Sequence, residues 1–179
     1  MGAGVGGSGS GGGGGGSVRV RAATPADVEQ IYAWIVELAE YERAPDAVVG
    51  TPELLSRALF GASPVAEAVI AEVDGERAGF AVFHGTFSTW ECRPGLWLED
   101  LYVPPARRRS GVGLALLSWL ARTAVERGCA RLEWAALEWN TPALRFYDKL
   151  GATRLKDWYM HRLEGDVLAR VASGAGAGG

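Results

Sequence analysis

The stretch Arg107-Arg108-Arg109-Ser110-Gly111-Val112-Gly113 says most about the fold of this 179-residue chain. It lies between an expected strand over residues 96–103 and an expected helix over residues 111–127. Backbone N–H groups are unpaired at the amino end of a helix, where the helix dipole also favours an anion. Glycines let a phosphate approach the backbone, and arginines add charge-assisted hydrogen bonds. The stretch therefore predicts a site for a phosphorylated ligand, with a pyrophosphate favoured.

The same residues narrow the kind of ligand. A P-loop needs Gly-Lys-Ser/Thr, which is absent. A dinucleotide fingerprint needs a third glycine where Leu116 stands. Two alternatives stay open from the residues alone. One is a basic helix entry that contacts only solvent. The other is a nucleic-acid patch, which the short arginine run and the net charge of −3 disfavour.

Hydrophobic periodicity on both sides of this stretch predicts a mixed α/β fold in the order β-α-α-β-β-β-α-β-α-β. Thr24 and Pro25 indicate the start of the first helix, and Asp74-Gly75 indicates a hairpin turn. Strands are expected over 18–21, 69–73, 79–87, 96–103, 132–137 and 158–163, and helices over 24–42, 51–61, 111–127 and 141–150.

Composition predicts one domain over residues 18–172 between two disordered tails, residues 1–17 and 173–179. Eleven of the 26 glycines lie in the first tail and four in the second. The absence of an apolar run of 18 residues and of a secretory signal predicts a cytoplasmic protein without a membrane span. Two cysteines, Cys92 and Cys129, and two histidines, His84 and His161, fit no zinc site or disulfide framework, so no metal is expected.

The chain resembles the GNAT superfamily of N-acetyltransferases, because Arg108-x-x-Gly111-x-Gly113 matches its acyl-CoA signature. Three further segments resemble the spermidine/spermine and thialysine N-acetyltransferases, over about residues 18–163. They are Glu37-Leu38-Ala39-Glu40-Tyr41-Glu42, Leu98-Glu99-Asp100-Leu101-Tyr102-Val103, and Glu138-Trp139-Asn140 followed by Phe146-Tyr147. The resemblance implies a mostly antiparallel sheet flanked by helices, acetyl-CoA as cosubstrate, acetyl transfer to a primary amine, and a homodimer.

The resemblance also assigns residues to acetyl-CoA. The pyrophosphate would bind at Arg108 and on the backbone of Arg109, Ser110, Gly111, Val112 and Gly113. Pantetheine would lie along a splayed strand at Leu101, Tyr102 and Val103, and Asn140 and Tyr147 would also contact the cosubstrate.

Acetyl transfer needs a base for the ammonium group and an acid for the departing thiolate. Glu99 is the candidate base. Asp100 stands beside it, and strand alternation predicts that the two point to opposite faces. Tyr147 is the candidate acid, because a phenol pKa near 10 suits protonation of a basic thiolate. The residues alone allow Glu99 to pair with one of the arginines 107–109, and Tyr147 to be a core aromatic.

The acceptor is the least determined part of the hypothesis. Tyr41, Glu42, Glu99, Asp100, Trp90 and Trp158 are the candidates for an amine site built from carboxylates and aromatic faces. Tyr41 and Glu42 could equally form a plain helix end. Arg93 and a shorter stretch after Gly151 depart from the polyamine enzymes, so the acceptor stays open between a polyamine, a diamine and a lysine-like amine. A protein or antibiotic amine, or a non-catalytic acyl-CoA-binding module, is the alternative.

Overall fold

The computed structural model describes residues 17–174, in two compact units that meet between Leu137 and Glu138. Residues 1–16 and 175–179, which make up most of the two expected tails, lie outside the described residues. Each unit is described by itself below. No helix within the described range is long and apolar enough to cross a membrane.

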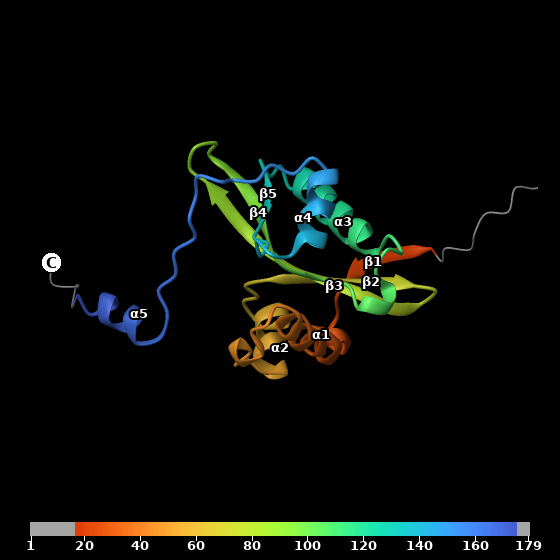
Figure 1. Cartoon of the computed structure of the whole chain (residues 1–179). Helices are drawn as coiled ribbons and strands as arrows, with labels where there is room; N and C mark the ends of the chain where they lie inside the picture. The colour runs from red at the N-terminus through yellow and green to blue at the C-terminus, as the bar shows by residue number, and fades with distance from the viewer. Residues whose placement is uncertain (1–16, 175–179) are drawn as a thin grey trace, which may run out of the picture. The chain divides into compact units, whose positions relative to one another are not determined.

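The first unit contains a five-stranded sheet in the order β1-β2-β3-β4-β5 (Figure 1). The strands are β1 (Val18–Ala22), β2 (Glu67–Val73), β3 (Glu76–Ser88), β4 (Arg93–Tyr102) and β5 (Leu132–Trp134). Neighbours from β1 to β4 are antiparallel, and β5 is parallel to β4. The mixed, mostly antiparallel sheet predicted from the sequence is confirmed.

Helices cover both faces of this sheet (Figure 1). α1 (Val28–Tyr41) and α2 (Pro52–Phe60) lie on one face, and α3 (Val112–Glu126) lies on the other. Three short 3-10 turns, η1 (Pro25–Asp27), η2 (Pro45–Ala47) and η3 (Pro105–Arg107), join these elements. The helix positions predicted from caps and periodicity are confirmed within a few residues.

Each face has its own apolar core. Beneath α1 and α2 the buried side chains form one cluster: Ile31, Trp34, Leu59, Ala68, Ile70, Phe80, Val82 and Tyr102. On the other face α3 buries an apolar stripe of Val112, Leu116, Leu117, Leu120 and Ala124. Phe83 of β3 meets Trp119 of α3 in an edge-to-face contact with 5.9 Å between ring centres. Val82 and Phe83 therefore mark the two faces of β3, one core on each side.

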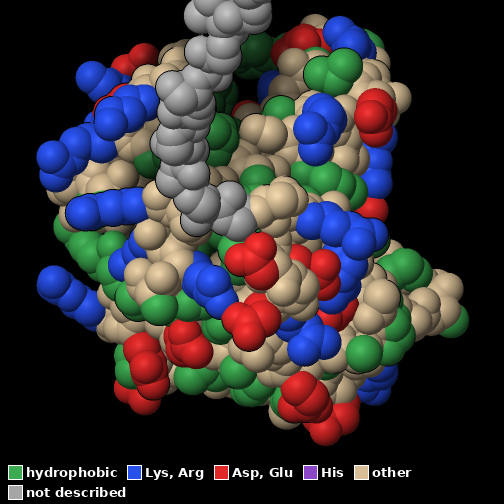
Figure 2. Space-filling view, turned by 90° about the vertical axis from the view of Figure 1, so that its right-hand side faces the viewer, with side chains coloured by type: hydrophobic (Ala, Val, Ile, Leu, Met, Phe, Trp, Pro, Cys, Tyr) green, Lys and Arg blue, Asp and Glu red, His purple; other side chains and the backbone are tan. Residues whose placement is uncertain are grey.

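Asp27 is buried under the end of the sheet and is neutralised by two arginines. Arg21 and Arg77 each approach its carboxylate to 2.7 Å, and the Thr24 N–H donates to it over 2.8 Å. The Arg21 hydrogen bond, opposed by burial and assisted by Thr24 and Arg77, holds the pKa of Asp27 far below its usual range. Figure 2 shows basic and acidic side chains lying next to one another on this side of the molecule.

The second unit contains α4 (Thr141–Lys149) and α5 (Gly165–Ala172). The predicted strand over residues 158–163 is wrong, because these residues have no regular structure. A strand needs a neighbour to receive its backbone hydrogen bonds, and the described residues of this unit include no other strand. Helix α5 was not expected, and β5 ends at Trp134 rather than near Leu137.

Candidate functional site

The loop between β4 and α3 presents backbone N–H groups at the amino end of a 15-residue helix. Arg109 and Gly111 have positive φ angles of 65° and 84°, and Gly111 is the N-cap residue. The Ser110 hydroxyl donates to the carbonyl oxygen of Arg107 over 2.6 Å, which closes the loop. Within residues 17–174, no backbone carbonyl accepts from the N–H groups of Ser110, Gly111, Val112 or Gly113. These groups and the helix dipole suit a phosphate.

Two of the three arginines in this loop are held by the protein itself. Arg107 pairs with Glu76 of β3 at 2.5 Å. Arg108 donates from Nε to the carbonyl oxygen of Val103 over 3.1 Å, and its guanidinium carbon lies 4.9 Å from the centre of the Tyr41 ring. Tyr41, predicted for the amine site, therefore contacts the loop before α3 from the end of α1.

β4 and β5 pair over three residues and then separate. Leu96–Leu98 pair with Leu132–Trp134, whereas β4 continues to Tyr102 with β3 on its other side. Leu101 and Tyr102 lie in this stretch beyond the last β5 pair, and Val103 follows it directly. An unpaired strand edge of this kind can bind an extended ligand through the backbone. The geometry agrees with the splayed strand expected from the sequence.

The Tyr102 side chain lies in the core and does not take part in this strand edge. It is 5% exposed within the core beneath α1, and its hydroxyl donates to Glu37 Oε2 over 2.8 Å. Burial, together with the hydrogen bond to Glu37, raises the pKa of Tyr102 to about 12. A ligand at the strand edge can therefore contact the backbone of Tyr102 but not its side chain.

Glu99 is the extra residue of a β-bulge in β4. Asp100 pairs with Val82, and Leu98 pairs with Phe83. Glu99 therefore has no partner of its own in β3 and is an extra residue of β4. Both bulge residues lie opposite Val82, on the α1 face of the sheet. The expectation that Glu99 and Asp100 point to opposite faces is therefore wrong, because the bulge interrupts the alternation on which it depended.

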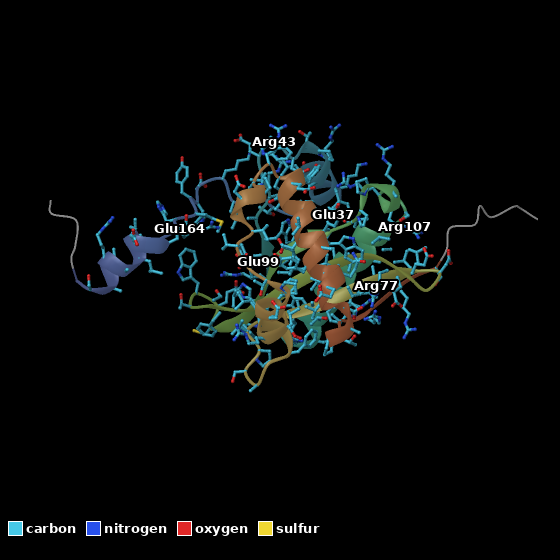
Figure 3. All side chains as sticks on the ribbon, turned by 90° about the horizontal axis from the view of Figure 1, so that it is seen from below. Glu37, Arg43, Arg77, Glu99, Arg107 and Glu164 are labelled. Carbon is cyan, nitrogen blue, oxygen red and sulfur yellow. The ribbon has the colours of Figure 1, made fainter. Side chains whose placement is uncertain are left out.

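Three carboxylates lie close together where this face of β4 meets the end of α1. Burial is the main cause that raises the pKa of Asp100 to about 6, and the charges of Glu99 and Glu42 raise it further. Burial also raises the pKa of Glu42, which caps the carboxyl end of α1. Figure 3 looks onto this side and labels Glu99, together with Glu37 and Arg43 on and after α1. The cluster has the sign and partial burial that suit a cationic ligand.

Two side chains contact the Glu99 carboxylate. Trp97 Nε1 donates to Oε2 over 2.8 Å, and His84 Nε2 lies 3.8 Å from the same oxygen. His84 and Trp97 are cross-strand partners in the β3–β4 ladder. The alternative in which Glu99 pairs with one of the arginines 107–109 is not found among the ion pairs of the described residues, where Glu99 lies beside His84 and Arg107 pairs with Glu76.

Comparison with known proteins gives the family. Residues 28–152 match the Acetyltransferase (GNAT) family. The chain belongs to the GNAT acetyltransferases. It is 34% identical over 164 residues to the thialysine N-epsilon-acetyltransferase of Bos taurus, covering 86% of this chain and 96% of that protein. It is 30% identical over 163 residues to spermidine/spermine N(1)-acetyltransferase-like protein 1 of Homo sapiens, covering 86% of this chain and 23% of that protein.

A solved structure shows the same fold. An integron cassette protein from the mobile metagenome of V. cholerae superposes with a TM-score of 0.72 at 26% identity, covering 87% of this chain and 98% of that one. GNAT acetyltransferases use acetyl-CoA as a general rule. Among the described residues, no group of three or more His, Cys, Asp or Glu side chains could hold a metal ion.

The remaining predicted residues lie in the turn after β3 and in the second unit. Trp90 lies in the exposed turn between β3 and β4. Asn140, Tyr147 and Trp158 belong to the second unit and are placed within it. The Asn140 side chain caps α4 by accepting from the Ala143 N–H over 3.3 Å, and the Tyr147 ring lies 5.3 Å from that of Phe146. Trp158 is exposed in the segment before α5.

Sequence reasoning missed His84, Trp97 and Glu37. Glu37 stands in one of the quoted segments, but nothing in its spacing indicates that it accepts from Tyr102. His84 and Trp97 are 13 positions apart and meet because of the β3–β4 register. A hairpin alignment centred on the turn after Ser88 is the signal that could have paired them.

Proposed function

We propose that this protein is an acetyl-CoA-dependent N-acetyltransferase whose acceptor is a primary amine of a small cationic molecule. The observation that carries the acceptor class is the cluster of Glu42, Glu99 and Asp100 on the α1 face of β4. Burial raises the pKa of Asp100 to about 6, and the negative charges of Glu99 and Glu42 raise it further. A bound ammonium group would supply the counter-charge that this cluster lacks.

Acetyl-CoA fits the groups that the first unit offers. The backbone of Arg109, Ser110, Gly111, Val112 and Gly113, with the Arg108 side chain, would hold the pyrophosphate. The β4 edge at Leu101–Val103 would hold the pantetheine arm. The cosubstrate supplies an acetyl thioester, and the protein orients the amine toward it in a ternary complex, which replaces a bimolecular encounter by a positioned one.

Two of the three carboxylates are proposed to bind the ammonium group, and the third to remove a proton from it. Asp100 and Glu42 are the more desolvated pair, so they are best suited to bind the ammonium group by charge. Glu99 is 59% exposed and has one oxygen, Oε1, that neither Trp97 nor His84 contacts. We assign Glu99 the role of the base that removes a proton from the ammonium group, directly or through a water molecule.

Tyr147 is the proposed acid that protonates the departing thiolate, and Asn140 is a proposed contact of the acetyl-CoA arm. Both assignments rest on the resemblance of Glu138-Trp139-Asn140 and Phe146-Tyr147 to the thialysine and polyamine enzymes. The phenol suits the task because its ordinary pKa of about 10 lets it stay protonated at neutral pH and still release a proton to a basic thiolate.

The acceptor is proposed to be a diamine, a polyamine or a lysine-like amine. The names of the relatives at 34% and 30% identity support this range. Tyr41, Trp90 and Trp158 are the aromatic candidates for its apolar part. The same resemblance supports a homodimer as part of the proposal, and the cytoplasmic location in it rests on the composition of the sequence.

Calorimetry and product analysis test this function together. We expect acetyl-CoA to bind, and mass spectrometry to find an acetylated product after incubation with thialysine, spermidine or a short diamine. Binding without acetylated product from any amine would instead make the protein an acyl-CoA-binding module. No binding of acetyl-CoA by the folded protein would remove the proposal altogether.

A further inference from the structure

His84 stands at the Glu99 carboxylate from the neighbouring strand. Its Nε2 atom lies 3.8 Å from Glu99 Oε2, a distance that a small side-chain rotation or one water molecule closes. The bulge at Glu99 and the pairing of His84 with Trp97 bring the three side chains together. Nothing in the proposed function uses the imidazole, although its two ring nitrogens can accept and donate a proton.

The other ring nitrogen determines the state of Nε2. His84 Nδ1 lies 3.1 Å from the carbonyl oxygen of Gly85, and a carbonyl oxygen can only accept. Nδ1 must therefore carry the proton in that hydrogen bond. In the neutral ring the Nε2 lone pair then faces Glu99, so this nitrogen can accept a proton from the carboxyl group.

Trp97 makes the transfer directional. Its Nε1–H donates to Glu99 Oε2 over 2.8 Å, which holds that oxygen toward His84 and leaves Oε1 for the amine. The His84 and Glu99 side chains are 38% and 59% exposed, so water reaches the imidazole. The charged groups near this pair are Asp100, next to Glu99 on β4, and Glu42 beyond it at the end of α1.

We propose that His84 is a proton relay that returns Glu99 to its ionised form after each turnover. The inference rests on the proposed role of Glu99. The ammonium group of the acceptor gives one proton to the Glu99 carboxylate, which leaves a neutral amine and a carboxylic acid. The acid passes this proton from Oε1 through a water molecule to Nε2 of neutral His84, forming an imidazolium beside a carboxylate. The imidazolium then releases the proton to water, and both side chains regain their starting states.

Chemical rescue separates a relay from a structural role. At saturating substrates and low buffer concentration, His84→Gln is expected to lower kcat about tenfold, with KM for both substrates unchanged. Imidazole in the buffer should restore kcat in this variant and leave the wild type unaffected. Trp97→Phe should also lower kcat, but without rescue, because it displaces the carboxylate and removes no proton acceptor. His161→Gln is the matched control.

The outcomes are distinct from those for the proposed function. Amine-dependent turnover by the wild type together with wild-type kcat in His84→Gln at low buffer would overturn the relay and leave the acetyltransferase standing. A loss that imidazole does not restore would also overturn it. Nitrogen-15 chemical shifts of the unmodified full chain test the geometry without turnover. We expect neutral His84 to carry its proton on Nδ1, and a proton on Nε2 would contradict the relay.

Discussion

Glu99 and Asp100 are adjacent in sequence and yet lie on the same face of the sheet, because Glu99 is the extra residue of a bulge opposite Val82. Asp100 is thereby near the charges of both Glu99 and Glu42, the latter at the end of α1. Like charges held together in a partly buried place are costly to ionise.

Asp100→Asn is expected to stabilise the protein at neutral pH. The pKa of Asp100 is about 6 in the folded protein against 3.8 ordinarily, so the folded state binds this proton more tightly. The stabilisation it brings is complete below the ordinary value and is lost as pH rises through 6. The neutral amide of the variant has no such loss. Above pH 6 we therefore expect its free energy of unfolding to exceed that of the wild type by about 1–3 kcal/mol. Urea unfolding across this pH range measures it, with Asp74→Asn as control; equal stability at neutral pH would contradict it.

Amine affinity should depend on the same proton. As pH falls through about 6, Asp100 becomes neutral and one of the charges that hold the ammonium group disappears. We expect the KM for the amine to rise below this pH in the wild type, while Asp100→Asn has a raised KM that stays flat across it. Initial rates at saturating acetyl-CoA give both curves. The same pH dependence of this KM in the two proteins would show that Asp100 does not bind the amine.

Asp27→Asn is expected to cost about 3 kcal/mol, since it leaves Arg21 and Arg77 beside an uncharged partner. The pKa of Asp27 is lowered on folding, so its stabilisation is present above the ordinary value of 3.8 and is lost as pH falls below it. The difference in free energy of unfolding between the variant and the wild type should therefore become smaller at acidic pH. Glu67→Gln, in an exposed pair with Arg127, is the control and should cost about 0.5 kcal/mol. Equal losses in the two variants would show that burial is not the cause.

Gly111→Ala should weaken acetyl-CoA binding beyond its cost in stability. Gly111 and Gly75 have φ angles of 84° and 83°, and a Cβ atom on either would meet nothing within 4 Å. Alanine at each is therefore expected to cost about 1 kcal/mol of stability through backbone strain alone. Calorimetry should find acetyl-CoA affinity reduced in Gly111→Ala and unchanged in Gly75→Ala, which lies in the β2–β3 turn. Equal acetyl-CoA affinities in the two variants would show that this loop does not bind the cosubstrate.

Tyr147→Phe is expected to lower kcat about 100-fold while acetyl-CoA affinity stays the same, because the variant removes one hydroxyl and keeps the ring. Steady-state rates and calorimetry measure the two quantities. Tyr159→Phe removes the same atom from an exposed side chain of the same unit and is the matched control. Unchanged kcat in Tyr147→Phe would assign the acid role to another group.

Local signals in the sequence were enough for much of this fold. The N-cap and proline signals at Thr24 and Pro25, the hairpin turn at Asp74-Gly75, and the arginine–glycine loop before α3 each depend on a few neighbouring residues. The stripe of Val112, Leu116 and Leu120 depends on helical periodicity alone. Such features are predictable because the interactions that produce them lie within one or two turns of chain.

The errors came from interactions between distant segments. The bulge at Glu99 exists because β3 and β4 pair in two registers, and no residue in either strand signals it. The same register brings His84 to Trp97 and Glu99. The expected strand over residues 158–163 has apolar and aromatic side chains but no strand beside it in its unit. A pattern can favour an extended segment, but a partner strand must complete it.

The rate of thiol release from acetyl-CoA, measured with thialysine as acceptor in the wild type and in Glu99→Gln, tests the central claim most directly. We predict release that depends on the amine in the wild type. In Glu99→Gln we predict a kcat about 100-fold lower at saturating substrates, because the amide cannot take the proton. Wild-type protein that releases no thiol with any cationic amine, or a Glu99→Gln variant as fast as the wild type, would contradict the claim.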